Sequence, residues 1–155
     1  MKKGIGVGIE DFREVIREDC YYFDKTNYIE ELIKDKTKIK LFTRPRRFGK
    51  TLNMSTLKYF FDVKNAEENR KLFKDLYIEK SEYFKEQGQY PVIFITLKDL
   101  KKNTWKEMNF EIKELLRNLY DEFNFIRDTL SISDLREFDK IWLKEEDANY
   151  DSSLL

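Results

Sequence analysis

The sequence lacks histidine entirely and contains a single cysteine, Cys20, among its 155 residues. An internal disulfide is therefore impossible, and the common zinc sites, which need several Cys or His ligands, are excluded. Catalytic triads and acid–base pairs built on histidine are excluded for the same reason. Any chemistry must use carboxylates, Lys, Arg, Ser, Thr, Tyr or a bound cation.

The chain also lacks net charge and long apolar runs. Its 30 basic residues balance 30 acidic ones, which argues against a protein that coats DNA or an anionic membrane by bulk electrostatics. The start, MKKGIGVGIEDF, has no continuous apolar segment, and no run approaches the length of a membrane span. We therefore expect a cytoplasmic protein without membrane contact. Aromatic residues make up 15% of the chain, so we expect it to fold.

Short β-branched segments predict two strands, KIKLF (38–42) and VIFITL (92–97). Apolar residues at helical spacing predict helices near residues 12–16, 28–33, 50–61, 66–73, 104–123 and 133–144. Asp11 is placed to cap the first of these helices. Asn27 and Glu30 have the form of a capping box at the second, although Thr26 or Asp24 could serve as the cap instead.

The stretch TRPRRFGKT, residues 43–51, lies between a predicted strand and a predicted helix. This is the context of a phosphate-binding P-loop, in which Gly49 lets the backbone approach, Lys50 reaches the phosphates and the Thr51 hydroxyl ligates Mg²⁺. Arg44 stands where such loops have their first glycine, and Pro45 contributes no N–H. The alternative interpretation is a surface turn whose arginines are simply solvated.

Three segments together resemble the prokaryotic AAA-ATPase-like family: YYFDKT (21–26), KLFTRPRRFGKTLNMSTLKYFF (40–61) and PVIFITLKD (91–99). The resemblance covers essentially the whole chain, and this family writes its P-loop as R-P-R-R-F-G-K-[ST]. It implies that ATP or another NTP binds with Mg²⁺. Carried over by position, Lys50 takes the phosphates, Thr51 takes phosphate and metal, and Arg46, Arg47, Phe48 and Gly49 line the loop. The matching triplet Asp24-Lys25-Thr26 is best interpreted as a helix cap with a salt bridge.

The predicted fold class is α/β, a partial P-loop NTPase-like three-layer fold with parallel strands flanked by helices. The whole chain, 1–155, is expected to be the N-terminal part of such a domain. It divides into a helical entry segment (1–37), a strand, P-loop and helix (38–61), and a mainly helical part with one buried strand (62–155). In the family a PD-(D/E)XK nuclease-like domain usually follows.

The acidic Walker B strand that hydrolysis requires is missing from the chain. Asp99 is the nearest substitute, but it lacks a neighbouring Glu, and Glu145-Glu146-Asp147 lies in a polar tail. We therefore expect a nucleotide-binding module with little or no turnover, and no residue is assigned as catalytic. The exposed sheet edge predicts self-association. The alternatives are a nucleic-acid phosphate contact through the Arg-rich loop, or an interaction domain without a ligand.

Overall fold

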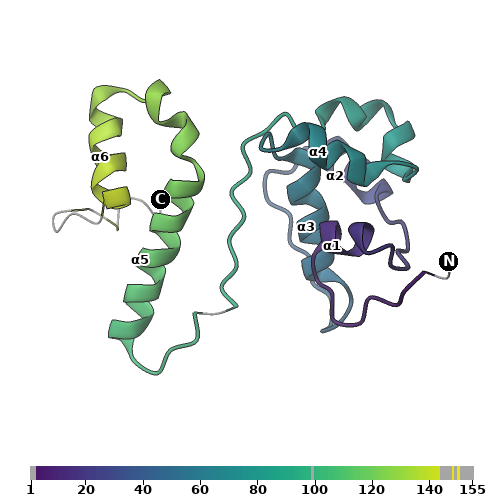
Figure 1. The fold of residues 1–155 in the computed structure, drawn as a ribbon, viewed down its shortest axis with the longest axis horizontal. Helices are drawn as coiled ribbons and strands as arrows, with labels where there is room; N and C mark the ends of the chain where they lie inside the picture. The colour runs from purple at the N-terminus through teal and green to yellow at the C-terminus, as the bar shows by residue number, and fades with distance from the viewer. Residues whose placement is uncertain (1–2, 99, 144–147, 149, 151–155) are drawn as a thin grey trace. The chain divides into compact units, whose positions relative to one another are not determined.

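The computed structural model describes residues 3–98, 100–143, 148 and 150. The chain divides into two compact units, Met1–Phe94 and Ile95–Leu155. Both units are helical, as Figure 1 shows.

The first unit contains four α-helices, α1 (Phe12–Arg17), α2 (Asn27–Lys34), α3 (Lys50–Phe61) and α4 (Ala66–Arg70). Three short 3-10 helices follow, η1 (Lys71–Phe73), η2 (Tyr77–Lys80) and η3 (Glu82–Glu86). All of these elements except α4 supply apolar side chains to one core, formed by Phe12, Ile29, Phe60, Leu72, Phe73, Ile78 and Phe84. Phe73 lies against Phe12 and Phe60, with ring centroids 5.2 and 5.3 Å apart. Aromatic packing of this kind stabilises a core beyond the area it buries.

Polar contacts fix α3 against α1 and α2. Ser55 of α3 accepts a 2.9 Å hydrogen bond from the backbone N–H of Phe12, at the start of α1. The Tyr59 hydroxyl of the same helix donates to Asp11 over 2.7 Å. From the other side, the Tyr28 hydroxyl of α2 donates to the backbone carbonyl of Asn53 over 2.6 Å. The helix that follows the candidate loop is therefore braced by two neighbours.

The second unit pairs α5 (Trp105–Glu122) with α6 (Ile132–Leu143) through η4 (Asn124–Thr129). Thr104 and Glu107 form a capping box at the start of α5, which satisfies two N–H groups of the first turn. Arg127 donates two hydrogen bonds to the Asp139 carboxylate, 2.9 and 2.8 Å long. This pair ties η4 to α6.

The α/β fold class is wrong for this structure. Among the described residues there is no β-sheet, only two isolated bridges, Gly4–Cys20 and Asp62–Tyr90. The segment 38–42 is extended but unpaired, and Ile39 and Leu41 are 87% and 85% exposed. The segment 92–97 likewise forms no strand. Its side chains Ile93, Ile95 and Leu97 are exposed, so the predicted buried strand is also wrong. Local β-propensity makes a strand only where another strand accepts its hydrogen bonds, and two short segments alone are marginal.

Two further predictions change with the fold. The described part of the chain has no sheet, so self-association through a sheet edge has no structural basis there. The Asn27–Glu30 capping box is also wrong: α2 begins at Asn27, the residue before it is Thr26, and no side chain caps this start. The Asp11 cap is confirmed, since its carboxylate accepts from the Glu14 N–H over 3.1 Å.

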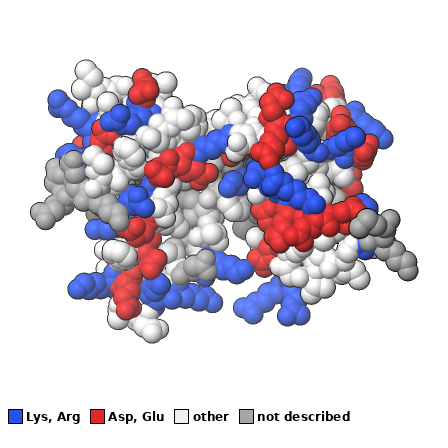
Figure 2. Space-filling view, viewed as in Figure 1, with Lys and Arg blue, Asp and Glu red and all other residues white. Residues whose placement is uncertain are grey.

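Surface charge is mixed. Figure 2 shows Lys and Arg interspersed with Asp and Glu on the visible face of each unit, in keeping with the zero net charge. None of the helices in the described residues is both long enough and apolar enough to cross a bilayer.

Candidate functional site

The loop before α3 contains two residues in the left-handed backbone conformation. Arg47 has φ 67° and Gly49 has φ 70°, and α3 begins at the next residue, Lys50. Glycine adopts this region at little cost, whereas an L side chain such as that of Arg47 is strained there. No side chain caps the start of α3. The first N–H groups of the helix, which have no acceptor within the helix, are therefore directed toward the loop.

Lys50 folds back across this loop. Its ammonium group donates to the backbone carbonyls of Arg44 and of Pro45, the latter over 2.9 Å. These two hydrogen bonds tie the Lys50 side chain to the first part of the loop. Thr51, the next residue, is exposed, and within the described residues no hydrogen bond of its hydroxyl occurs. This hydroxyl is open to a ligand.

Arg44 is compatible with the loop for a backbone reason. The described non-glycine residues with positive φ are Asp19, Arg47, Asn65 and Asp75. Arg44 is not among them, so its position does not require the left-handed conformation that favours glycine. The Lys50 ammonium donates to the backbone carbonyl of Arg44, a group that any residue would supply.

Two pockets flank the loop. The larger, about 520 Å³, lies between the loop and α2 and is lined by Lys25, Asn27, Tyr28, Glu31, Phe42, Arg44, Phe48, Lys50, Asn53, Met54 and Leu57. The smaller, about 150 Å³, includes Gly49, Leu52 and Asn53 of the loop and helix together with Tyr22 and Lys25. Lys25 and Asn53 line both pockets. The larger pocket combines an apolar wall with two lysines, the mixture typical of small-molecule sites.

The triplet Asp24-Lys25-Thr26 connects α2 to η2. The Asp24 carboxylate accepts from the N–H and hydroxyl of Thr26 (2.8 and 2.7 Å) and from the N–H of Tyr77 (2.6 Å). Thr26 is fully buried, and its oxygen accepts from the N–H of Ile78 over 3.1 Å. Among the described residues Asp24 has no ion pair, so the predicted salt bridge is wrong there; the triplet is a hydrogen-bonded corner.

Nearby tyrosines stay protonated. Burial, and then the neighbouring Asp24 carboxylate, raise the pKa of Tyr22 to about 12. Burial, and then Tyr22, raise the pKa of Tyr28 further. The Tyr28 hydroxyl consequently remains a donor to Asn53 throughout the physiological pH range.

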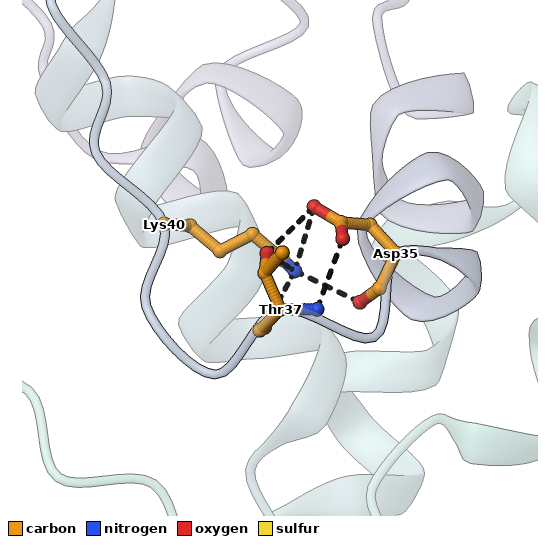
Figure 3. Close-up of polar contacts among 3 residues, drawn as sticks. All are labelled: Asp35, Thr37 and Lys40. Atoms are coloured by element: carbon orange, nitrogen blue, oxygen red, sulfur yellow. Dashed lines mark hydrogen bonds and ion pairs between the residues drawn. The ribbon is translucent and has the colours of Figure 1, made fainter.

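A polar clasp holds the chain between α2 and the loop (Figure 3). The Asp35 carboxylate accepts from the N–H and the hydroxyl of Thr37 (3.0 and 2.9 Å). The Lys40 ammonium lies 2.9 Å from the same carboxylate and donates to the carbonyls of Asp35 and Thr37, both at 2.8 Å. The Lys40 side chain, followed by the Thr37 bonds, lowers the pKa of Asp35 to about 2.

The structure brings some of the sequence-predicted residues together and leaves others apart. Gly49, Lys50 and Thr51 meet at the start of α3, and Phe48 lines the larger pocket. Arg46 and Arg47 are exposed and line neither pocket. Sequence reasoning missed Lys25, Tyr28 and Asn53 as neighbours of the loop. The D-K-T triplet drew attention to Lys25 but not to its position in space, and no sequence signal pointed to Tyr28 or Asn53.

The acidic residues considered from the sequence as metal or water ligands cannot be placed relative to this site. Asp99 and Glu145-Glu146-Asp147 lie outside the described residues. Among those that are described, no three His, Cys, Asp or Glu side chains gather to hold a metal ion.

Comparison with known proteins gives the family. A family model described as predicted AAA-ATPase matches residues 6–154. The chain belongs to this family. Its relative in Azotobacter chroococcum mcd 1, an uncharacterized protein in the vnfD 5' region, is 41% identical over 61 residues. Those residues are 39% of this chain but only 12% of that protein's length. No solved structure matches.

Proposed function

We propose that this AAA-ATPase-like chain binds a nucleoside triphosphate, ATP or a close relative, through the loop 43–51. The observation that carries the proposal is that the Lys50 ammonium donates to two loop carbonyls, those of Arg44 and Pro45, directly before an uncapped helix start. An ammonium in that position exchanges carbonyl oxygens for phosphate oxygens when the anion arrives. Helix N–H groups then share the negative charge. Membership in a family described as ATPases supports the same ligand.

Within this proposal each loop residue has a role. Gly49 supplies the left-handed turn and bears no side chain between the backbone and the phosphates. Lys50 contacts the terminal phosphates. Phe48, 61% exposed and lining the larger pocket, offers an aromatic face to the nucleoside. Arg46 and Arg47 are exposed cations that reach the phosphate chain from outside the pockets.

Magnesium is compatible with the residues present. Mg²⁺ prefers oxygen ligands, keeps several waters and usually takes only one or two protein groups beside substrate phosphates. The Thr51 hydroxyl, in the first turn of α3, provides one such oxygen. When bound, the ion neutralises charge on the phosphates. Thr51 orients it, and Lys50 holds the same anion from the loop side.

We expect little or no hydrolysis by this chain. Turnover requires a carboxylate that positions water and metal beside the phosphates. Among the described residues that line the loop pockets, Glu31 is the one acidic side chain. Glu31 accepts a 3.4 Å hydrogen bond from Asn27 and is assigned no part in the reaction.

Isothermal titration with ATP·Mg²⁺ tests the proposal. The wild-type chain should bind, and Lys50→Ala should weaken binding at least tenfold, because the charge-assisted bonds to phosphate contribute about 1.5–3 kcal/mol. Lys80→Ala removes an exposed lysine of η2 that lines neither loop pocket and is the matched control. Equal affinity in wild type and Lys50→Ala, or no binding by wild type, would refute the proposal. Rapid hydrolysis dependent on Lys50 would refute the expectation of low turnover.

Exposure of the arginines supports a second candidate, contact with a nucleic-acid backbone. Arg44, Arg46 and Arg47 are all exposed beside exposed Phe48, an arrangement able to combine phosphate contacts with base stacking. The double variant Arg46→Ala/Arg47→Ala should then abolish most single-strand binding, and wild-type affinity should fall steeply with salt. Affinity independent of salt would dismiss this function.

A further inference from the structure

Lys25 lies in an unexpected place for a residue of a structural corner. Its neighbours Asp24 and Thr26 are engaged in hydrogen bonds that join α2 to η2. Lys25 itself is exposed, and its ammonium makes no hydrogen bond or ion pair among the described residues. Its side chain instead lines both pockets that flank the candidate loop.

The corner fixes where Lys25 can reach. Thr26 is fully buried and bonded through both its N–H and its hydroxyl, and the Lys25 carbonyl accepts from the N–H of Tyr28 over 3.0 Å. The backbone on either side of Lys25 is therefore held, and only its side chain is free to move. Binding a ligand would then have to order the Lys25 side chain, but not the backbone that carries it.

The charge balance of the larger pocket favours an anion. Of the described residues, Lys25, Arg44 and Lys50 line it, against one carboxylate, that of Glu31. Lys25 and Lys50 come from segments of the chain far apart in sequence, and only the fold brings both to one pocket. Among the described residues no acceptor bonds to the Lys25 ammonium, whereas the Lys50 ammonium already donates to two loop carbonyls. An anionic ligand would supply the acceptor that Lys25 lacks.

We propose that Lys25 is a second phosphate-binding cation of the nucleotide site, opposite Lys50. The inference rests on the proposed function, since it assumes that the pocket beside the loop takes the polyphosphate. It divides the D-K-T triplet by role: Asp24 and Thr26 build the corner, and Lys25 contacts the ligand. The ligand class is a polyphosphate, and the nucleoside adds contacts with the apolar wall.

Titration with two probes, ATP·Mg²⁺ and inorganic tripolyphosphate with Mg²⁺, tests the assignment on the 155-residue chain. Lys25→Gln should weaken both probes roughly tenfold or more, since a lost charge-assisted bond to phosphate has that effect. Lys25→Arg should retain most of the affinity. Lys80→Gln, with the same change of charge outside both pockets, should bind like wild type.

A thermal melt without ligand separates contact from folding. Lys25→Gln should melt at the wild-type temperature, because the Lys25 ammonium makes no hydrogen bond or ion pair with the described residues that the change could remove. Unchanged affinity in Lys25→Gln, with binding still weakened at least tenfold in Lys50→Ala, would overturn the role of Lys25 and leave the nucleotide site standing. A lowered melting temperature that accounts for the lost affinity would overturn it as well. Failure of wild type to bind either probe would refute both proposals together.

Discussion

Thr26 offers the sharpest test of how the first unit is held together. It is fully buried, its hydroxyl donates to Asp24 over 2.7 Å, and its oxygen accepts from the N–H of Ile78 over 3.1 Å. Thr26→Val keeps the shape of the side chain and removes both hydrogen bonds. The buried N–H of Ile78 then has no acceptor, while Asp24 keeps the N–H donors of Thr26 and Tyr77.

The expected loss follows from three contributions. An unpaired buried donor costs about 1–3 kcal/mol, and the lost bond to a carboxylate adds to this. The extra buried methyl group returns about 0.8 kcal/mol. We therefore expect Thr26→Val to lower the free energy of unfolding by about 2 kcal/mol, roughly 8–16 °C in melting temperature for a unit of this size.

Thr26→Ser is the matched control, because it keeps the hydroxyl and loses only a buried methyl group, about 1 kcal/mol. Thermal unfolding followed by circular dichroism should rank the variants as wild type, then Ser, then Val. Hydrogen exchange at the Ile78 amide should accelerate in Val alone. Hydrophobicity alone would make Thr26→Val more stable than Thr26→Ser. That order of melting temperatures, or an unchanged exchange rate of the Ile78 amide in Thr26→Val, would refute the reasoning.

Two further predictions concern the same unit. At Gly88 (φ 71°) an added Cβ would lie 2.5 Å from the Cβ of Ala66, whereas at Gly8 (φ 83°) it would meet nothing within 4 Å. In denaturant unfolding Gly88→Ala should therefore cost about 2–4 kcal/mol, from backbone strain plus overpacking, and Gly8→Ala only about 1–2; equal losses would contradict the clash. The pKa of Asp35 is lowered to about 2, so the clasp stabilises the fold above the unfolded pKa of about 4 and is lost as the pH falls from there toward 2. An NMR titration of the Asp35 carboxyl should show this low pKa, and Lys40→Met should raise it toward the ordinary value; an unshifted pKa in wild type would dismiss the clasp.

The helices could be predicted from the sequence because their signals are local. The stretch 50–61 was expected to be helical and forms α3, Lys50–Phe61; 104–123 forms α5, Trp105–Glu122. Apolar spacing and capping residues lie within a few positions of the elements they specify. Asp11 shows this most clearly, since its target N–H belongs to Glu14, three residues away.

The strand predictions were wrong because a strand is stable only when a partner strand, often distant in sequence, pairs with it. Residues 38–42 have the composition of a strand, yet the structure leaves Ile39 and Leu41 exposed and the backbone unpaired. The position of Lys25 beside the loop could not be predicted for the same reason, because it depends on contacts between distant parts of the chain. Lys25 and Lys50 line one pocket, and the corner that carries Lys25 is held by bonds from η2, more than fifty residues along the chain. No spacing rule connects those positions.

Arg44 shows how motif and geometry differ as guides to a loop. Written as a pattern, Arg44 occupies a glycine position and counts against a phosphate site. In the structure the left-handed backbone falls on Arg47 and Gly49 instead, and position 44 contributes a carbonyl to the Lys50 ammonium. A positive φ is what favours glycine, and Arg44 is not among the described residues with positive φ. The hydrogen bonds of Lys50 and the conformation of Gly49, and not the residue type at position 44, are therefore the features on which the proposed anion site depends.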